Sequence, residues 1–133
     1  MEAEHNPGAS GGVLLVDDDP DDLSLLQDLI ANRLPGVPVQ VATSPEQALD
    51  VLRDEKPSVI VSDYWMPGMD GVEFLRRARA LAPQARFIML TGAPDRFAFE
   101  SGQAESYSVL AKPIQPDLLA KLLQTLVRRS SDR

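Results

Sequence analysis

Residues 59–68 read VIVSDYWMPG, an apolar run that ends in the carboxylate of Asp63 and is soon followed by a Pro-Gly turn. A short, unbroken apolar run between turn signals is typical of a strand buried on both faces, as in a parallel sheet. Asp63 is therefore expected at the carboxyl end of a central strand, where open α/β sheets bind their ligands. An aspartate here can also merely end the strand or cap a turn, so its role depends on the other strand ends.

Four further segments have the pattern of strands, and helical patterns separate them. Alternating strands and helices predict an α/β fold with a five-stranded parallel sheet, helices on both faces and right-handed crossovers. The second strand alternates like an edge strand and the third reads as central, which fits the flavodoxin-like, doubly wound order 2-1-3-4-5. The other strands are predicted at 13–16, 37–41, 87–90 and 107–111, with helices beginning near residues 20, 45, 70 and 116.

Length and composition predict one domain in a chain of 133 residues. We place the domain at residues 12–128, between a polar, disordered lead-in at 1–11 and a frayed tail at 129–133. Residues 93–106 are expected to form a short or irregular fourth helix, because their serines and glycine weaken helix propensity.

Charge and cysteine content limit the function. The chain has no cysteine, no long apolar run and a net charge of −7. These features predict a cytoplasmic protein without disulfides or membrane spans. An acidic domain also binds nucleic-acid backbones poorly, so no direct nucleic-acid partner is expected.

Polar side chains follow four of the predicted strands. Asp17 and Asp18 end the first strand, Asp63 the third, Thr91 the fourth and Lys112 the fifth. In the predicted strand order these groups meet at one edge of the sheet, and three crowded carboxylates repel one another unless a cation is present. A cluster of oxygens without sulfur or histidine suits a hard ion, and Mg²⁺ fits best.

The same groups could handle a phosphoryl group. A cation and Lys112 could hold its charge, Thr91 could donate a hydroxyl hydrogen, and a carboxylate can act as the nucleophile. Taken singly, each group also has an ordinary interpretation. Acids at 17–22 suit a helix N-terminus, and an isolated lysine is most often a surface residue. The functional interpretation rests on the fact that each group ends a different apolar strand.

The set as a whole resembles the receiver domain of bacterial two-component response regulators, of the chemotaxis-regulator type. The residues that carry this resemblance are Val16-Asp17-Asp18, Asp63, Met66-Pro67-Gly68, Asp70-Gly71, Thr91-Gly92 and Lys112-Pro113. The resemblance covers roughly residues 12 to 128, and the motifs are specific as a set.

The resemblance implies that Asp63 accepts a phosphoryl group from a sensor histidine kinase or a histidine phosphotransfer protein. It implies that Asp18, Asp63 and the backbone carbonyl of Trp65 bind Mg²⁺, while Asp17 helps through water. Lys112 would pair with the phosphoryl group, Thr91 would move towards it as the switch, and the bond before Pro113 would be cis. Such a domain is a signalling phosphoacceptor rather than an enzyme, and catalyses only its own phosphorylation and dephosphorylation.

One position departs from the family pattern. The family usually has a Tyr or Phe three residues before the lysine, where this sequence has Val109. Tyr107 lies on the same face of the strand, about 6–7 Å further back. The usual aromatic switch is therefore not expected.

We expect a stand-alone receiver whose output is a phosphorylation-dependent protein contact or phosphate relay. The main alternative is a small phosphatase of the haloacid dehalogenase type, which would use Asp17 and Asp19; Pro20 and the lack of room for a cap domain speak against it. A flavin-binding module is disfavoured by carboxylates after the first strand, which repel phosphate. A degenerate scaffold is disfavoured by the complete set of acids, threonine and lysine.

Overall fold

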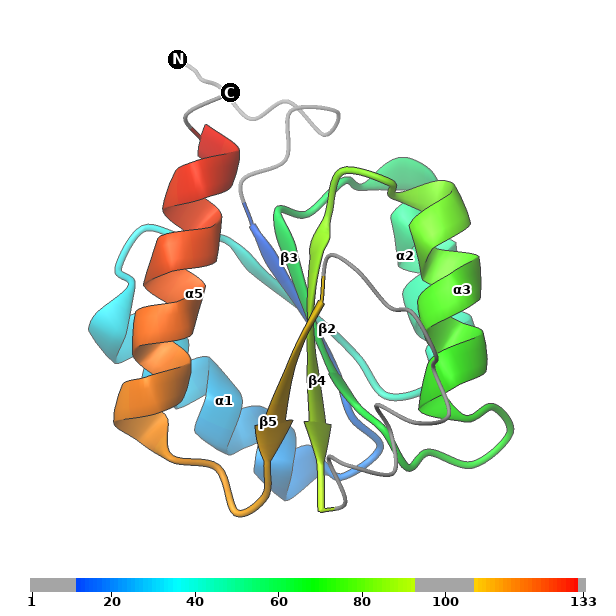
Figure 1. The fold of residues 1–133 in the computed structure, drawn as a ribbon, viewed down its shortest axis with the longest axis horizontal. Helices are drawn as coiled ribbons and strands as arrows, with labels where there is room; N and C mark the ends of the chain where they lie inside the picture. The colour runs from blue at the N-terminus through cyan, green and yellow to red at the C-terminus, as the bar shows by residue number, and fades with distance from the viewer. Residues whose placement is uncertain (1–11, 93–106, 132–133) are drawn as a thin grey trace.

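Five parallel strands form one sheet in the order β2-β1-β3-β4-β5, as predicted (Figure 1). The computed structural model describes residues 12–92 and 107–131, so the expectations for residues 1–11 and 93–106 lie outside it. The strands are β1 (Val13–Val16), β2 (Val39–Ala42), β3 (Val59–Asp63), β4 (Arg86–Thr91) and β5 (Tyr107–Ala111). The flavodoxin-like fold class is confirmed.

Two pairs of helices cover the two faces of the sheet. In Figure 1, α1 and α5 lie on one side, and α2 and α3 lie on the other. The helices are α1 (Pro20–Arg33), α2 (Pro45–Asp54), α3 (Gly71–Leu81) and α5 (Pro116–Ser131). None of these four helices is both long and apolar enough to cross a membrane.

The central strands are buried on both faces because successive side chains point to opposite sides. Leu14 and Ile60 join the apolar cluster that includes α2 and α3, whereas Leu15 and Val61 join the cluster that includes α1 and α5. Every residue of β1 and β3 is buried, while β2 has two exposed residues, as an edge strand should. The continuous apolar runs therefore did indicate buried strands.

Side-chain caps begin the first three helices at the carboxyl edge of the sheet. Asp19 accepts from the N–H of Asp21, and Ser44 accepts from the N–H of Gln47. The spacing of Ser44 and Gln47 suits a capping box, in which the Gln47 side chain would accept from the N–H of Ser44. The Gln47 side chain accepts from the N–H of Thr43 at 2.6 Å instead of reaching the cap residue.

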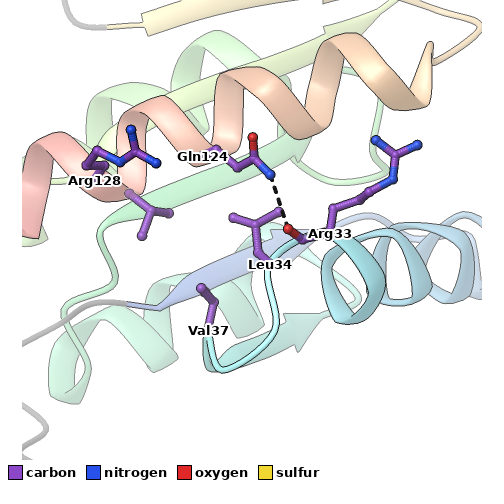
Figure 2. A pocket seen from close by; sticks show the side chains of 6 residues that line it. Arg33, Leu34, Val37, Gln124 and Arg128 are labelled. Atoms are coloured by element: carbon purple, nitrogen blue, oxygen red, sulfur yellow. Dashed lines mark hydrogen bonds between the residues drawn. The ribbon is translucent and has the colours of Figure 1, made fainter.

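The opposite end of the molecule holds a shallow pocket between α1 and α5 (Figure 2). The Gln124 amide donates to the backbone oxygen of Arg33 at 3.1 Å and so ties the end of α1 to α5. The residues that line the pocket are Arg33, Leu34, Val37, Gln124, Val127 and Arg128, and none of them is acidic. This pocket cannot supply the carboxylates that the sequence places at the other edge.

Candidate functional site

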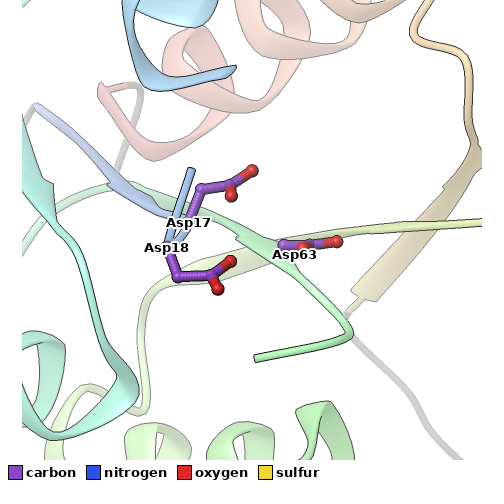
Figure 3. Close-up of side chains that lie close together, drawn as sticks. All are labelled: Asp17, Asp18 and Asp63. Atoms are coloured by element: carbon purple, nitrogen blue, oxygen red, sulfur yellow. The ribbon is translucent and has the colours of Figure 1, made fainter. Parts of the chain in front are cut away.

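The pairing of β1 with β3 brings the predicted acids together. Val16 lies beside Ser62 in the sheet, so Asp17 and Asp63 follow at the same edge. Asp17, Asp18 and Asp63 each offer a carboxylate oxygen, and these oxygens lie within 4.8 Å of one another. Figure 3 shows the three carboxylates gathered at the ends of the two strands. Asp17 and Asp63 are buried and Asp18 is exposed, so the cluster opens to solvent on the side of Asp18.

Asp17 is the most deeply buried member of this cluster. Its side chain is 1% exposed, and burial, followed by the charges of Asp63 and Asp22, raises its pKa to about 6 against the lowering effect of an Asp19 hydrogen bond. Its Oδ1 accepts from the Asp19 N–H at 2.9 Å. Within the described part of the chain, its Oδ2 is buried without a hydrogen-bond partner. A buried carboxylate oxygen without a donor fits a site that holds a cation or its bound water.

The raised pKa of Asp17 predicts a pH effect on stability. Its folded-state pKa of about 6 exceeds the ordinary aspartate value of 3.8, so protonation favours the folded state. Without divalent cations, the free energy of unfolding should fall as pH rises from about 4 to about 6. The check is thermal unfolding at pH 4.5 and 6.5 in a chelator, with Asp17→Asn as the matched control. A decline that is equally large in Asp17→Asn would assign the effect to other groups.

Lys112 completes the site from β5. Its Nζ lies 2.9 Å from Oδ1 of Asp63 and 3.9 Å from Oδ2 of Asp22. Burial lowers the pKa of Lys112, but the hydrogen bond and charge of Asp63, with the charges of Asp17 and Asp22, outweigh burial and leave it raised. The lysine side chain is therefore protonated and positively charged at neutral pH. The bond between Lys112 and Pro113 is cis, as the resemblance implies.

Thr91 reaches the same edge at the end of β4. It is fully buried, and its backbone oxygen accepts from the N–H of Lys112 at 2.9 Å. The backbone thus fixes the switch candidate next to the lysine. Val109 and Tyr107 are both half-buried on β5, and nothing in the structure changes the expectation that Val109 cannot serve as an aromatic switch.

Trp65 lies in the loop that follows Asp63 and is 57% exposed. Its ring meets that of Tyr64 edge to face, with centroids 4.8 Å apart. Gly71 holds this loop close, since a Cβ at that position would come within 2.5 Å of the Tyr64 ring. The indole is therefore a surface residue next to the cluster of acids and is not part of the core.

Asp19 and Asp22 lie close to the cluster in the sequence but have contacts different from those of Asp17 and Asp18. Asp19, which the phosphatase alternative requires, is exposed and uses its carboxylate as the cap of α1. Asp22 is the residue that sequence reasoning missed, because its acidity was assigned to the helix N-terminus alone. Its position in the first turn of α1 was the available signal, but its contact with Lys112 depends on how α1 packs against the sheet.

Comparison with known proteins agrees with this site. The family model for the response regulator receiver domain matches residues 13–124. The chain belongs to this family. The receiver's cluster of acids around Asp63 is a phosphoacceptor cluster of the kind found in two-component systems, and the haloacid dehalogenase alternative is not supported.

Individual receiver proteins resemble this chain in sequence and in structure. It is 34% identical over 106 residues to the transcriptional activator protein ExaE of Pseudomonas putida, covering 77% of this chain but only 50% of ExaE. A CheY-like receiver domain protein from Methanospirillum hungatei shares its fold with a TM-score of 0.74 and 26% identity, covering 90% and 95% of the two chains. The receiver domain of a sensor histidine kinase from Pseudomonas aeruginosa was solved with magnesium in its active-site cleft. Its TM-score to this chain is 0.77 at 25% identity, and the match covers 89% of this chain and 98% of that one.

Proposed function

We propose that Asp63 accepts a phosphoryl group from a phosphohistidine on a sensor histidine kinase or a histidine phosphotransfer protein. The observation that carries this proposal is the position of the Asp63 carboxylate. It lies at the end of the central strand, within hydrogen-bonding distance of Lys112 and among two further acids. Receiver domains accept phosphoryl groups from histidine kinases, and the donor is inferred from membership of that family.

In the proposed step, one oxygen of the Asp63 carboxylate attacks phosphorus and forms a new P–O bond. The bond between phosphorus and the donor's imidazole nitrogen breaks, and the imidazole keeps that electron pair. A proton on its other ring nitrogen leaves the departing histidine neutral. The acyl phosphate on Asp63 carries the same phosphoryl oxygens, so no further reactant is needed.

The residues around Asp63 neutralise and orient charge rather than take part in bond formation. Lys112 would follow the negative charge from the carboxylate to the phosphoryl oxygens. Thr91 would donate its hydroxyl hydrogen to one of those oxygens and so report phosphorylation to the residues that follow β4. Both roles use groups that the backbone has already fixed at the site.

The donor set fits Mg²⁺. Asp18, Asp63 and the backbone carbonyl of Trp65 would bind it directly, and Asp17 would contribute through water. Support comes from three carboxylates, one with a buried oxygen that lacks a donor within the described residues, and from the magnesium-bound P. aeruginosa receiver. When bound, the ion would supply positive charge for the phosphoryl oxygens.

The test is phosphorylation of the purified chain by a small phosphodonor in Mg²⁺, followed by intact mass. We expect one phosphoryl group that is lost under the mild base that cleaves acyl phosphates. Uptake that survives such treatment, or that needs no divalent cation, would contradict the proposal.

Trp65 is expected to slow the loss of this phosphoryl group. Hydrolysis needs a water in line with the bond between Asp63 and phosphorus, and a large apolar ring beside the acceptor shields that approach. Trp65→Asn should hydrolyse roughly ten-fold faster, equivalent to about 1.4 kcal/mol of barrier. The decay of the phosphorylated form after donor removal measures this, and Trp65→Phe is the control that keeps an apolar ring. Equal decay in Asn and wild type would show that the indole does not limit water access.

The way in which the phosphorylated receiver acts on other proteins is inferred from its family. The chain spans about half the length of ExaE, whose name describes transcriptional activation. We propose that this receiver acts through phosphorylation-dependent protein contacts, and that it catalyses its own phosphorylation and dephosphorylation. Its expected cytoplasmic location stays a prediction.

A further inference from the structure

Lys112 lies near a second carboxylate besides that of Asp63, namely that of Asp22 in α1. Asp22 lies in the first turn of α1, and its Oδ2 is 3.9 Å from Nζ of Lys112. The two side chains are 34% and 30% exposed, so water only partly screens the pair. The ammonium group therefore lies between the acceptor carboxylate and Asp22, and both compete for its charge.

The charges at the site do not balance. Asp17, Asp18, Asp22 and Asp63 carry four negative charges when ionised, against the one positive charge that Lys112 supplies within the described residues. A bound divalent cation would still leave one excess negative charge. Without Asp22 the same site would be neutral.

The excess negative charge should affect a small phosphodonor most, because such a donor binds only at the site. A free phosphodonor dianion is repelled by a net negative site, and it has no other surface by which to bind. A protein donor can gain affinity from contacts away from the site. Phosphodonors of different charge should therefore respond differently to Asp22.

We propose that Asp22 is a specificity-determining residue that disfavours phosphorylation of Asp63 by small dianionic phosphodonors. Its carboxylate holds part of the Lys112 charge and adds negative charge near the acceptor. This inference rests on the proposed acceptance of a phosphoryl group by Asp63. Asp22 does not touch the reacting atoms, so it acts on the donor through charge and through Lys112.

The test compares two donors in wild type and Asp22→Asn, with saturating Mg²⁺ at low ionic strength and pH 7. With acetyl phosphate, a dianion, the Asp63 oxygen displaces acetate, which leaves with the electron pair of the broken P–O bond. With phosphoramidate, a monoanion whose nitrogen is protonated, the P–N bond breaks and ammonia leaves. Asp21→Asn is the matched control, since it removes the same charge from an exposed residue of the same turn.

We expect Asp22→Asn to speed uptake from acetyl phosphate by roughly five-fold, the upper range for one partly exposed ion pair. Uptake from phosphoramidate should change less than about two-fold, and added salt should shrink the difference. Mg²⁺ affinity, read from Trp65 fluorescence, should fall by about three-fold because the site loses a negative charge. A merely damaged fold cannot raise uptake while it weakens cation binding.

Several results would overturn the inference. Equal acceleration with both donors, an equal effect in Asp21→Asn, or unchanged uptake in Asp22→Asn would each remove Asp22 as a charge-based selector, while phosphorylation of the wild type would leave the proposed function standing. No phosphoryl uptake in wild type or variant would overturn the proposed function, and this inference with it.

Discussion

Replacement of Asp18 by alanine is expected to abolish Mg²⁺ binding and, with it, phosphoryl uptake. Asp18 is the exposed member of the cluster, whereas Asp17 is buried and Asp63 is already paired with Lys112. Removal of this carboxylate takes away the most accessible ligand for a hydrated ion. Phosphoryl uptake should fall by at least about 100-fold, the usual cost of losing one electrostatic stabiliser from a transition state.

Two readouts test the Asp18 prediction together. Trp65 is the only tryptophan in the chain, so its fluorescence reports on Mg²⁺ at the neighbouring site, and intact mass reports uptake. Asp28→Ala is the matched control, because it removes an exposed acid from the same part of the sequence without touching the cluster. If Asp18→Ala binds Mg²⁺ as wild type does, the metal assignment is wrong.

Replacement of Lys112 by alanine should move the two readouts in opposite directions. The lysine is 2.9 Å from Asp63, where it shares the carboxylate with any bound cation. Its loss should tighten Mg²⁺ binding by several-fold, because a competing positive charge disappears. Phosphoryl uptake should nevertheless fall by about 30- to 100-fold, since the developing charge on the phosphoryl oxygens loses its partner.

Lys121→Ala provides the control for the lysine prediction. Lys121 is an exposed lysine of α5, and its removal changes the net charge by the same amount. Both readouts should stay at their wild-type values in this variant. Weaker Mg²⁺ binding in Lys112→Ala would show that the lysine supports the acids instead of competing with the cation.

The groups of this site are legible in the sequence because each of them ends a strand. An apolar run leads directly into Asp17 and another into Asp63, and a parallel sheet brings such ends to one edge. The edge character of β2 and the central place of β3 then select the strand order. That order, and the separation of the two faces, follow from local patterns alone.

Contacts between elements are less legible, and they account for what sequence reasoning missed. The pairing of Asp22 with Lys112 depends on the angle of α1 against the sheet, which no local pattern specifies. The same holds for Gln47, whose side chain accepts from the N–H of Thr43, one residue before the cap residue Ser44. One oxygen of Asp17 is buried without a donor among residues 12–92 and 107–131, and this too is a property of the assembled site.

In the proposed function, the carboxylate of Asp63 carries the phosphoryl group. The most direct measurement is reduction of the phosphorylated protein with borohydride, which converts an aspartyl phosphate into homoserine, followed by peptide mass mapping. We expect homoserine at position 63, and no conversion in Asp63→Asn or in protein that has not been incubated with a phosphodonor. Homoserine at position 17 or 18, or a phosphoryl group that resists reduction and stays on a hydroxyl, would contradict it.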